Sequence, residues 1–136
     1  MGSLVKLCFS GDYTYGEVKK MITGNGGMVS YLGTNDGRQV SEMIANDNEK
    51  ARLIYQAMAY QVSKEIGAVS AVLHGDVDAI LLTGGLAFDT MFTDWIAERV
   101  KFIADVHIYP GEDELEALAE GGLRVLSGQE EAKVYK

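Results

Sequence analysis

The chain has 136 residues, of which 47% are hydrophobic, and its formal net charge is −8. This length and hydrophobic content fit one folded domain, and the acidic balance argues against a nucleic-acid partner because few cations remain to neutralise phosphates. Cys8 has no internal disulfide partner, the apolar start is too short for a secretory signal, and no stretch approaches the roughly 20 apolar residues of a membrane-spanning helix, so we expect a cytoplasmic protein with no membrane partner.

Short helical patterns open the chain. Residues 4–8 carry one apolar helical face, and Thr14 followed three residues later by Glu17 has the capping-box pattern of a second helix. Residues 11–16 have the glycine spacing of a phosphate loop, but the Lys-Ser/Thr pair that must follow is missing, which excludes that motif. Residues 28–32 fit either a short strand or a tight helical turn.

A polar loop, residues 33–38, precedes a predicted helix that runs to about Ala45. Thr34, Asn35 or Asp36 can each cap this helix, which is the simplest explanation of their presence. A second interpretation is that Asp36 and Arg38 face a ligand. The residues alone leave both interpretations open.

A long helix is predicted at about residues 48–74. Its apolar residues recur at spacings of three and four from Ala51 to Leu73, which gives a length of roughly 40 Å at 1.5 Å per residue. His74 stands at its end, where a protonated imidazole would favour the helix dipole, and this explains the residue better than a catalytic role does.

The run from Val77 to Leu82 is apolar except for Asp78, and glycines bound it on both sides. This pattern predicts a strand buried on both faces, and the helical patterns before and after it predict a parallel βαβ arrangement. Gly84 and Gly85 follow the strand. Ligands of open α/β sheets bind at the carboxyl ends of strands, and glycine there lets the main chain approach a ligand closely.

A helix marked by Phe92 and Trp95, with Trp95 in the core, and a second parallel strand at residues 104–109 complete the predicted sheet region. A last helix begins at Glu112-Asp113-Glu114. Acidic residues at a helix start complement the helix dipole, but they are also the oxygen ligands that Mg²⁺ prefers. Both explanations remain open from spacing alone.

Five segments, in this order, resemble the C-terminal part of the butyrate kinases, which are related to acetate kinases within the actin-like ATPase and sugar kinase superfamily. They are residues 7–11 (LCFSG), 31–36 (YLGTND), 57–61 (AMAYQ), 78–85 (DAILLTGG) and 109–119 (YPGEDELEALA). The resemblance implies an α/β fold, a partial ribonuclease H-like (actin-like ATPase) domain, with residues 1–136 as the C-terminal ATP-binding domain. It also implies transfer of the ATP γ-phosphoryl group to a short-chain carboxylate, giving an acyl phosphate, with Mg²⁺.

The resemblance also implies the site. The nucleotide-binding residues would be Asn35, Asp36, Arg38, Thr83, Gly84, Gly85, Leu86 and Ala87, and the metal residues would be Glu114 and Asp113. The segment at residues 35–38 matches Ser-Asp-Met-Arg of acetate kinases. Those enzymes continue the Thr-Gly-Gly motif with Gly-Glu-Asn, whereas this chain has residues 87–89 as Ala-Phe-Asp.

Members of the resembled family are much longer, and their phosphate motifs and acid pocket lie in segments that this chain does not show. We therefore expect little or no kinase activity from this chain alone. The strands at residues 77–83 and 105–109 would be the last two of a five-stranded sheet, whose open edge and face invite self-association, and the resemblance implies a homodimer. The alternative is a non-catalytic dimerisation module derived from the kinase domain.

Overall fold

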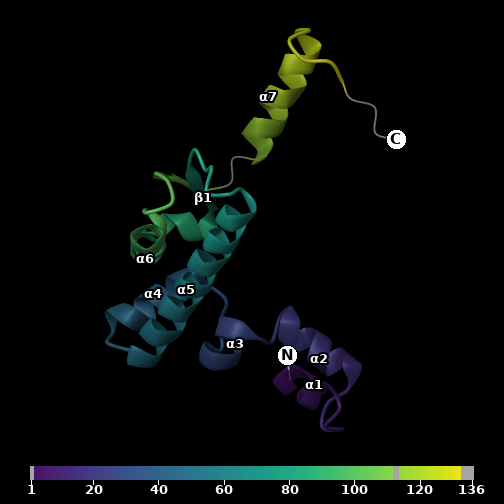
Figure 1. Ribbon diagram of the computed structural model, residues 1–136, viewed down its shortest axis with the longest axis vertical. Coiled ribbons are helices and arrows are strands. Elements are labelled where there is room, and N and C mark those ends of the chain that lie inside the picture. The colour runs from purple at the N-terminus through teal and green to yellow at the C-terminus, as the bar shows by residue number, and fades with distance from the viewer. Residues whose placement is uncertain (1, 112–113, 133–136) are drawn as a thin grey trace.

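The computed structural model describes residues 2–111 and 114–132 and is a mixed α/β structure (Figure 1). Its elements follow in chain order: α1 (Gly2–Cys8), α2 (Tyr15–Ile22), α3 (Gly27–Leu32), α4 (Gly37–Ala45), α5 (Glu49–Val72), β1 (Ile80–Gly84), the short 3-10 helix η1 (Gly85–Phe88), α6 (Thr90–Val100), β2 (Val106–Pro110) and α7 (Glu114–Leu126). In the part of the chain described, no helix combines the length and apolar character needed to cross a membrane.

Helix α5 is the longest element and confirms the predicted long helix. The side chain of Asn48 caps it by accepting a hydrogen bond from the Ala51 backbone N–H at 3.0 Å. It ends where the chain turns through His74, whose φ of 56° lies in the left-handed region, and Gly75. In Figure 1 α5 runs along the centre of the molecule, with α4 and α6 beside it.

The core lies where α4, α5 and α6 meet. Tyr55 is fully buried there, with its ring stacked on Phe92 at a centroid distance of 4.7 Å and edge-on to Trp95 at 6.1 Å. Val40 of α4 and Ile80 of β1 are buried in the same cluster. Burial of each such side chain stabilises the fold by about 1.5–3 kcal/mol, so this three-helix junction is the main source of stability. Trp95 is half-buried against this core, as expected.

The two strands pair in parallel, with Ile80 opposite Val106 and Gly84 opposite Pro110, which confirms the predicted arrangement. The prediction of a strand buried on both faces was wrong: Ile80 is buried, but Leu81 is 60% exposed. The physical reason is that helices α5 and α6 cover one face of the sheet, while the described residues leave the other face open. This exposed apolar face is a surface through which the expected self-association could take place.

The peripheral helices contribute little to this core. The capping box at α2 is confirmed, with the Thr14 backbone N–H donating to Glu17 Oε2 at 2.7 Å. The ambiguous residues 28–32 are helical, within α3. Neither α1 nor α2 contains a buried residue. In Figure 1 α7 projects beyond β1, and α1 and α2 lie at the opposite end of α5.

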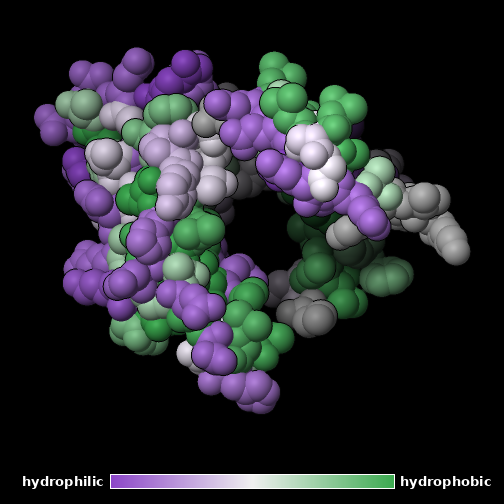
Figure 2. Space-filling view, turned by 90° about the horizontal axis from the view of Figure 1, so that it is seen from above, coloured by the Kyte–Doolittle hydropathy of each residue, from purple (hydrophilic) through white to green (hydrophobic). Residues whose placement is uncertain are grey.

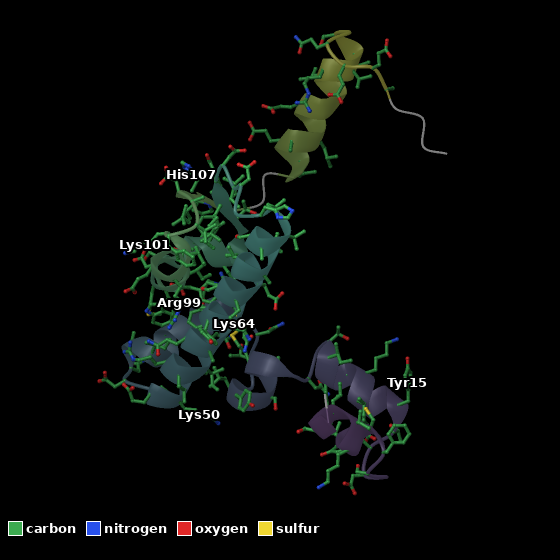
Figure 3. All side chains as sticks on the ribbon, in the orientation of Figure 1. Tyr15, Lys50, Lys64, Arg99, Lys101 and His107 are labelled. Atoms are coloured by element: carbon green, nitrogen blue, oxygen red, sulfur yellow. The ribbon has the colours of Figure 1, made fainter. Side chains whose placement is uncertain are left out.

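A surface contact joins α5 to α6 outside the core. The Arg99 guanidinium carbon lies 5.1 Å from the centre of the Tyr60 ring, and the Lys64 ammonium lies 5.8 Å from it. Figure 3 shows Lys64 and Arg99 in this region of the two helices. Exposed cation–π contacts are worth about 0.5–1 kcal/mol, so this pair is a minor addition to the buried packing.

Candidate functional site

A cavity of about 980 Å³ lies where the start of α4 meets η1, above the buried Tyr55. Five of the sequence-predicted nucleotide residues line it: Asn35, Asp36, Arg38, Gly85 and Leu86. The structure therefore brings together the two predicted segments, which are far apart in the sequence. The remaining lining residues are Gly37, Ser41, Glu42, Ala45, Tyr55, Phe88 and Asp89.

The loop before α4 orients one rim of this cavity. Asp36 caps α4 by accepting from the Arg38 backbone N–H at 2.9 Å, which confirms the simpler of the two explanations. Its carboxylate also accepts from Arg38 Nε at 3.3 Å and from Arg38 Nη2 at 3.2 Å. These hydrogen bonds lower the pKa of Asp36 and raise the pKa of Arg38. The Arg38 side chain is 90% exposed, so its outer face is accessible from the cavity mouth.

The two glycines after β1 have different structural roles. Gly84 has φ 87° and ψ −177°, a conformation that side-chain-bearing residues rarely adopt, and it exchanges two backbone hydrogen bonds with Gly111 at 3.1 and 3.2 Å. Gly85 needs no such conformation, and a Cβ added to it would meet no atom within 4 Å. The fold thus requires glycine at position 84, whereas at position 85 it leaves bare main chain beside the cavity.

Gly37 sets the distance between the two cavity walls. A Cβ on Gly37 would lie 2.7 Å from Leu86 Cδ2 and 3.1 Å from Tyr55 Oη. Both values are below ordinary van der Waals contact, so a side chain here would have to displace the end of Leu86 and would crowd the Tyr55 hydroxyl. Gly37 was not predicted as a site residue, because its demand for glycine comes from residues distant in the chain.

Asp89 lines the cavity and joins α4, α5 and α6 through its hydrogen bonds. Its Oδ1 accepts from the Phe92 backbone N–H at 3.2 Å and so caps α6, and its Oδ2 accepts from Tyr55 Oη at 3.0 Å and from the Ser41 hydroxyl. Burial is the main cause that raises the pKa of Tyr55, and the Asp89 charge raises it further. The capping role was detectable from an aspartate at a helix start, but the partners on α4 and α5 were not.

Some predicted site residues do not reach this cavity. Thr83 and Ala87 line a second cavity of about 340 Å³ between α5, β1 and α6, which Leu86 also borders. Gly84 supports the turn and is not among the lining residues of the larger cavity. Asp113 and the side chain of Glu114 lie outside the described residues, so the structure does not test the predicted metal site. Within the described residues, His, Cys, Asp and Glu side chains form no group of three or more that could hold a metal ion.

Comparison with known proteins identifies a family, a curated relative and a solved structure that this chain resembles. The model of the acetokinase family matches residues 5–117. Butyrate kinase 2 of Clostridium acetobutylicum is 58% identical over 135 residues, which cover 99% of this chain and 38% of that protein. The crystal structure of acetate kinase from Porphyromonas gingivalis superposes with a TM-score of 0.76 and 20% sequence identity, covering 92% of this chain and 38% of that one. At this identity the structural match shows a shared fold, and this chain spans about 38% of the length of each relative.

Proposed function

This chain belongs to the acetokinase family, and from that membership we propose that it is the nucleotide-binding part of a butyrate kinase. The reaction would be ATP-dependent phosphorylation of a short-chain carboxylate, which gives an acyl phosphate. Its partial actin-like ATPase fold is the fold of the structural neighbour. The proposal concerns the activity of a longer assembly, because this chain spans only 38% of the length of its relatives.

One observation carries the nucleotide assignment: Gly85 lines the cavity, yet the fold does not need a glycine there. A close approach between main chain and ligand explains this absence of a side chain. The cavity volume of about 980 Å³ lies within the range of small-molecule sites. Asp36 and Arg38 line the same cavity, as expected for residues that contact an adenosine group.

The predicted residues divide into two groups in this proposal. Asn35, Asp36, Arg38, Gly85 and Leu86 would contact the nucleotide, because they line the cavity. Thr83, Gly84 and Ala87 would act by holding the main chain of residues 85 and 86 in place from either side. Within the first group, the Asp36 carboxylate is suited to accept from ribose hydroxyls, and the exposed Arg38 guanidinium is suited to a phosphate or to the face of a base.

We also propose Mg²⁺ as a cofactor, held by Asp113 or Glu114. This rests on donor chemistry and family membership, since Mg²⁺ in phosphoryl-transfer sites takes one or two carboxylates together with substrate phosphates and water. When bound, the ion would neutralise charge on the transferring group. The family membership supports a homodimer, and the single exposed Cys8 is consistent with a reducing, cytoplasmic compartment.

A second candidate function is a non-catalytic assembly module. It is favoured by the apolar side chains exposed on α7, where Leu115 is 84% and Leu126 is 86% exposed. Figure 2 views the molecule from the α7 end and shows apolar surface beside hydrophilic surface there. Both functions can coexist, but only the first requires nucleotide binding.

Calorimetry with Mg-ADP and Mg-ATP on the 136-residue chain tests the first function. We expect saturable binding to the wild-type chain and none at millimolar nucleotide if the assembly module is the only function. A hydroxamate assay for butyryl phosphate then tests whether this chain needs further segments for kinase activity. It is run with this chain alone and with the remaining part of a full-length relative added. We expect no turnover by the chain alone, so product formed without the added part contradicts that expectation.

A further inference from the structure

We propose that Phe88 is a positioning residue for the candidate site: its ring rests on Gly111 and thereby holds η1 where a ligand can approach the main chain of that helix. The inference rests on the proposed nucleotide binding and adds a residue that acts on the site through the orientation of η1. Phe88 is also a position at which this chain departs from the acetate kinase pattern, because those enzymes have Glu there.

The 3-10 helix η1 has little stability of its own. It has four residues, and the Asp89 backbone N–H donates back to the Leu86 carbonyl oxygen at 3.1 Å. Helices of this type are short and have poor hydrogen-bond geometry, so contacts with other elements must fix the orientation of η1. Gly84 immediately before it is a glycine at φ 87°, and glycine resists backbone rotation less than any other residue.

Both ends of η1 contact one residue, Gly111, which follows β2. At the start of η1, Gly84 and Gly111 exchange backbone hydrogen bonds at 3.1 and 3.2 Å. At its end, the ring of Phe88 lies so close that a Cβ added to Gly111 would be 3.3 Å from Phe88 Cζ and 3.6 Å from Cε2. The main chain between Gly84 and Phe88 is therefore held by two contacts with the same point at the end of the sheet.

Burial in the core does not explain Phe88. Its side chain is 68% exposed, and it lines the same cavity as Gly85 and Leu86. The neighbouring Ala87 is only 4% exposed, so it is the residue that packs η1 against the interior. A mostly exposed side chain adds little to stability, and the contact that distinguishes Phe88 is the one with Gly111.

A main chain that is already held in place binds a ligand at a lower entropic cost. Without the ring contact, η1 could pivot about Gly84, and only part of the population would present the main chain of Gly85 in the competent orientation. Affinity falls in proportion to that fraction, although no group that touches the ligand has been removed. We expect a loss of at least about fivefold in nucleotide affinity.

Two substitutions of similar volume test the role of the ring contact. Phe88→Met keeps a side chain whose terminal methyl reaches about as far as the ring edge, whereas the branched side chain of Phe88→Leu is too short to reach Gly111. Calorimetry of the full 136-residue chain with ADP should give Phe88→Met an affinity within about twofold of the wild-type chain and Phe88→Leu one at least about fivefold weaker. Because the side chain is largely exposed, the urea midpoint of unfolding should move by no more than about 0.5 M in either variant.

Gly111→Ala breaks the same contact from outside the cavity, since Gly111 is not among the residues that line it. The matched control is Gly75→Ala, because Gly75 has a φ of 78°, comparable in sign to the 101° of Gly111, but an added Cβ there meets nothing within 4 Å. Both variants should lose stability through backbone strain, and only Gly111→Ala should also bind ADP more weakly.

Equal ADP affinities of the Leu and Met variants, or a Leu variant that binds as tightly as the wild-type chain, overturn the inference and leave the proposed function standing. The same holds if Gly111→Ala binds ADP as tightly as Gly75→Ala. No binding of ADP by the wild-type chain at millimolar concentration overturns both the inference and the proposed nucleotide binding.

Discussion

Gly37 lies against Leu86: a single Cβ added to Gly37 would come within 2.7 Å of Leu86 Cδ2. The contact joins the first residue of α4 to the 3-10 helix that follows β1. It therefore sets the spacing between the two walls of the candidate nucleotide cavity, and it depends on the missing side chain of one residue.

Replacement of Gly37 by Ala should destabilise the fold. The new methyl group can displace the flexible end of Leu86, but the buried Tyr55 hydroxyl at 3.1 Å cannot move as easily. Overpacking of this kind typically costs about 1–3 kcal/mol, and we expect about 1–2 kcal/mol because Leu86 can yield. Urea unfolding monitored by circular dichroism measures the change.

Gly67→Ala is the matched control, because Gly67 lies inside α5 and an added Cβ there meets nothing within 4 Å. Alanine favours the helix over glycine by up to about 1 kcal/mol, so this variant should be more stable than the wild-type chain. Equal effects of the two substitutions would show that Gly37 is not in a tight contact.

Replacement of Asp89 by Ala should be the more severe change. It removes the cap of α6, worth about 1 kcal/mol, and leaves the hydroxyls of Ser41 and Tyr55 without their acceptor, at about 1–3 kcal/mol. We expect a loss of about 2–4 kcal/mol in urea unfolding. Asp94→Ala, at an exposed aspartate of the same helix, should change stability by no more than about 0.5 kcal/mol. A loss below about 1 kcal/mol for Asp89→Ala would contradict the three-helix role.

The raised pKa of Tyr55 predicts a loss of stability in alkali. The folded pKa lies above the unfolded value near 10, so the contribution of Tyr55 is fully present below about pH 10 and is lost as pH rises above it. Tyr55→Phe removes this titration. In urea unfolding between pH 9 and 11, the wild-type chain should lose stability more steeply than the variant, by an added slope approaching about 1.4 kcal/mol per pH unit. Parallel pH profiles would show that Tyr55 ionises as easily in the folded chain.

Local sequence patterns were sufficient for the features that depend on neighbouring residues. The capping box at Thr14 and Glu17, the cap at Asp36 and the long helix after Asn48 each arise from contacts within one turn. The burial of β1 was not predictable in this way. Whether Leu81 is covered depends on which strands and helices surround the sheet, and its own run of apolar residues carries no information about that.

In the candidate site, too, the sequence predicted local features but not the contacts between residues that are distant in the chain. Of the two glycines at the end of β1, Gly85 lies in one wall of the cavity, and the family resemblance identified Asp36 and Arg38 in the other wall. The links between the walls were missed: Gly37 with Leu86, and Asp89 with Ser41 and Tyr55. Each of these links joins residues from different elements, so only the folded chain brings the partners together.

The different roles of Gly84 and Gly85 give a test that separates binding from stability. Gly85→Val places a side chain in open space beside the cavity, so the free energy of unfolding should change by less than about 1 kcal/mol. The same variant should bind ADP at least about tenfold more weakly. Gly84→Ala forces a side chain into a conformation with φ 87° and should lose about 1–3 kcal/mol of stability. Calorimetry and urea unfolding on both variants measure this, and unchanged ADP binding by Gly85→Val would argue against close main-chain approach.

The exposed apolar face of α7 predicts self-association of the chain. Leu115, Leu118 and Leu126 share one side of this helix by their spacing, and each is more than 70% exposed, at 84, 72 and 86%. Burial of each such side chain is worth about 1.5–3 kcal/mol, so covering this face with a second copy would offset much of the entropic cost of association. Sedimentation velocity across a range of protein concentrations should show a concentration-dependent shift to a larger species.

The double variant Leu118→Lys, Leu126→Lys should shift this equilibrium toward the monomer. The chain has a net charge of −8, so added lysines lessen the general repulsion between copies, and any weaker association must come from lost apolar contact. Glu120→Lys places the same side chain on the opposite side of α7 and should leave association intact. If the double variant associates as strongly as the wild-type chain, the contact between copies lies elsewhere, and the open face of the sheet at Leu81 becomes the surface to substitute next.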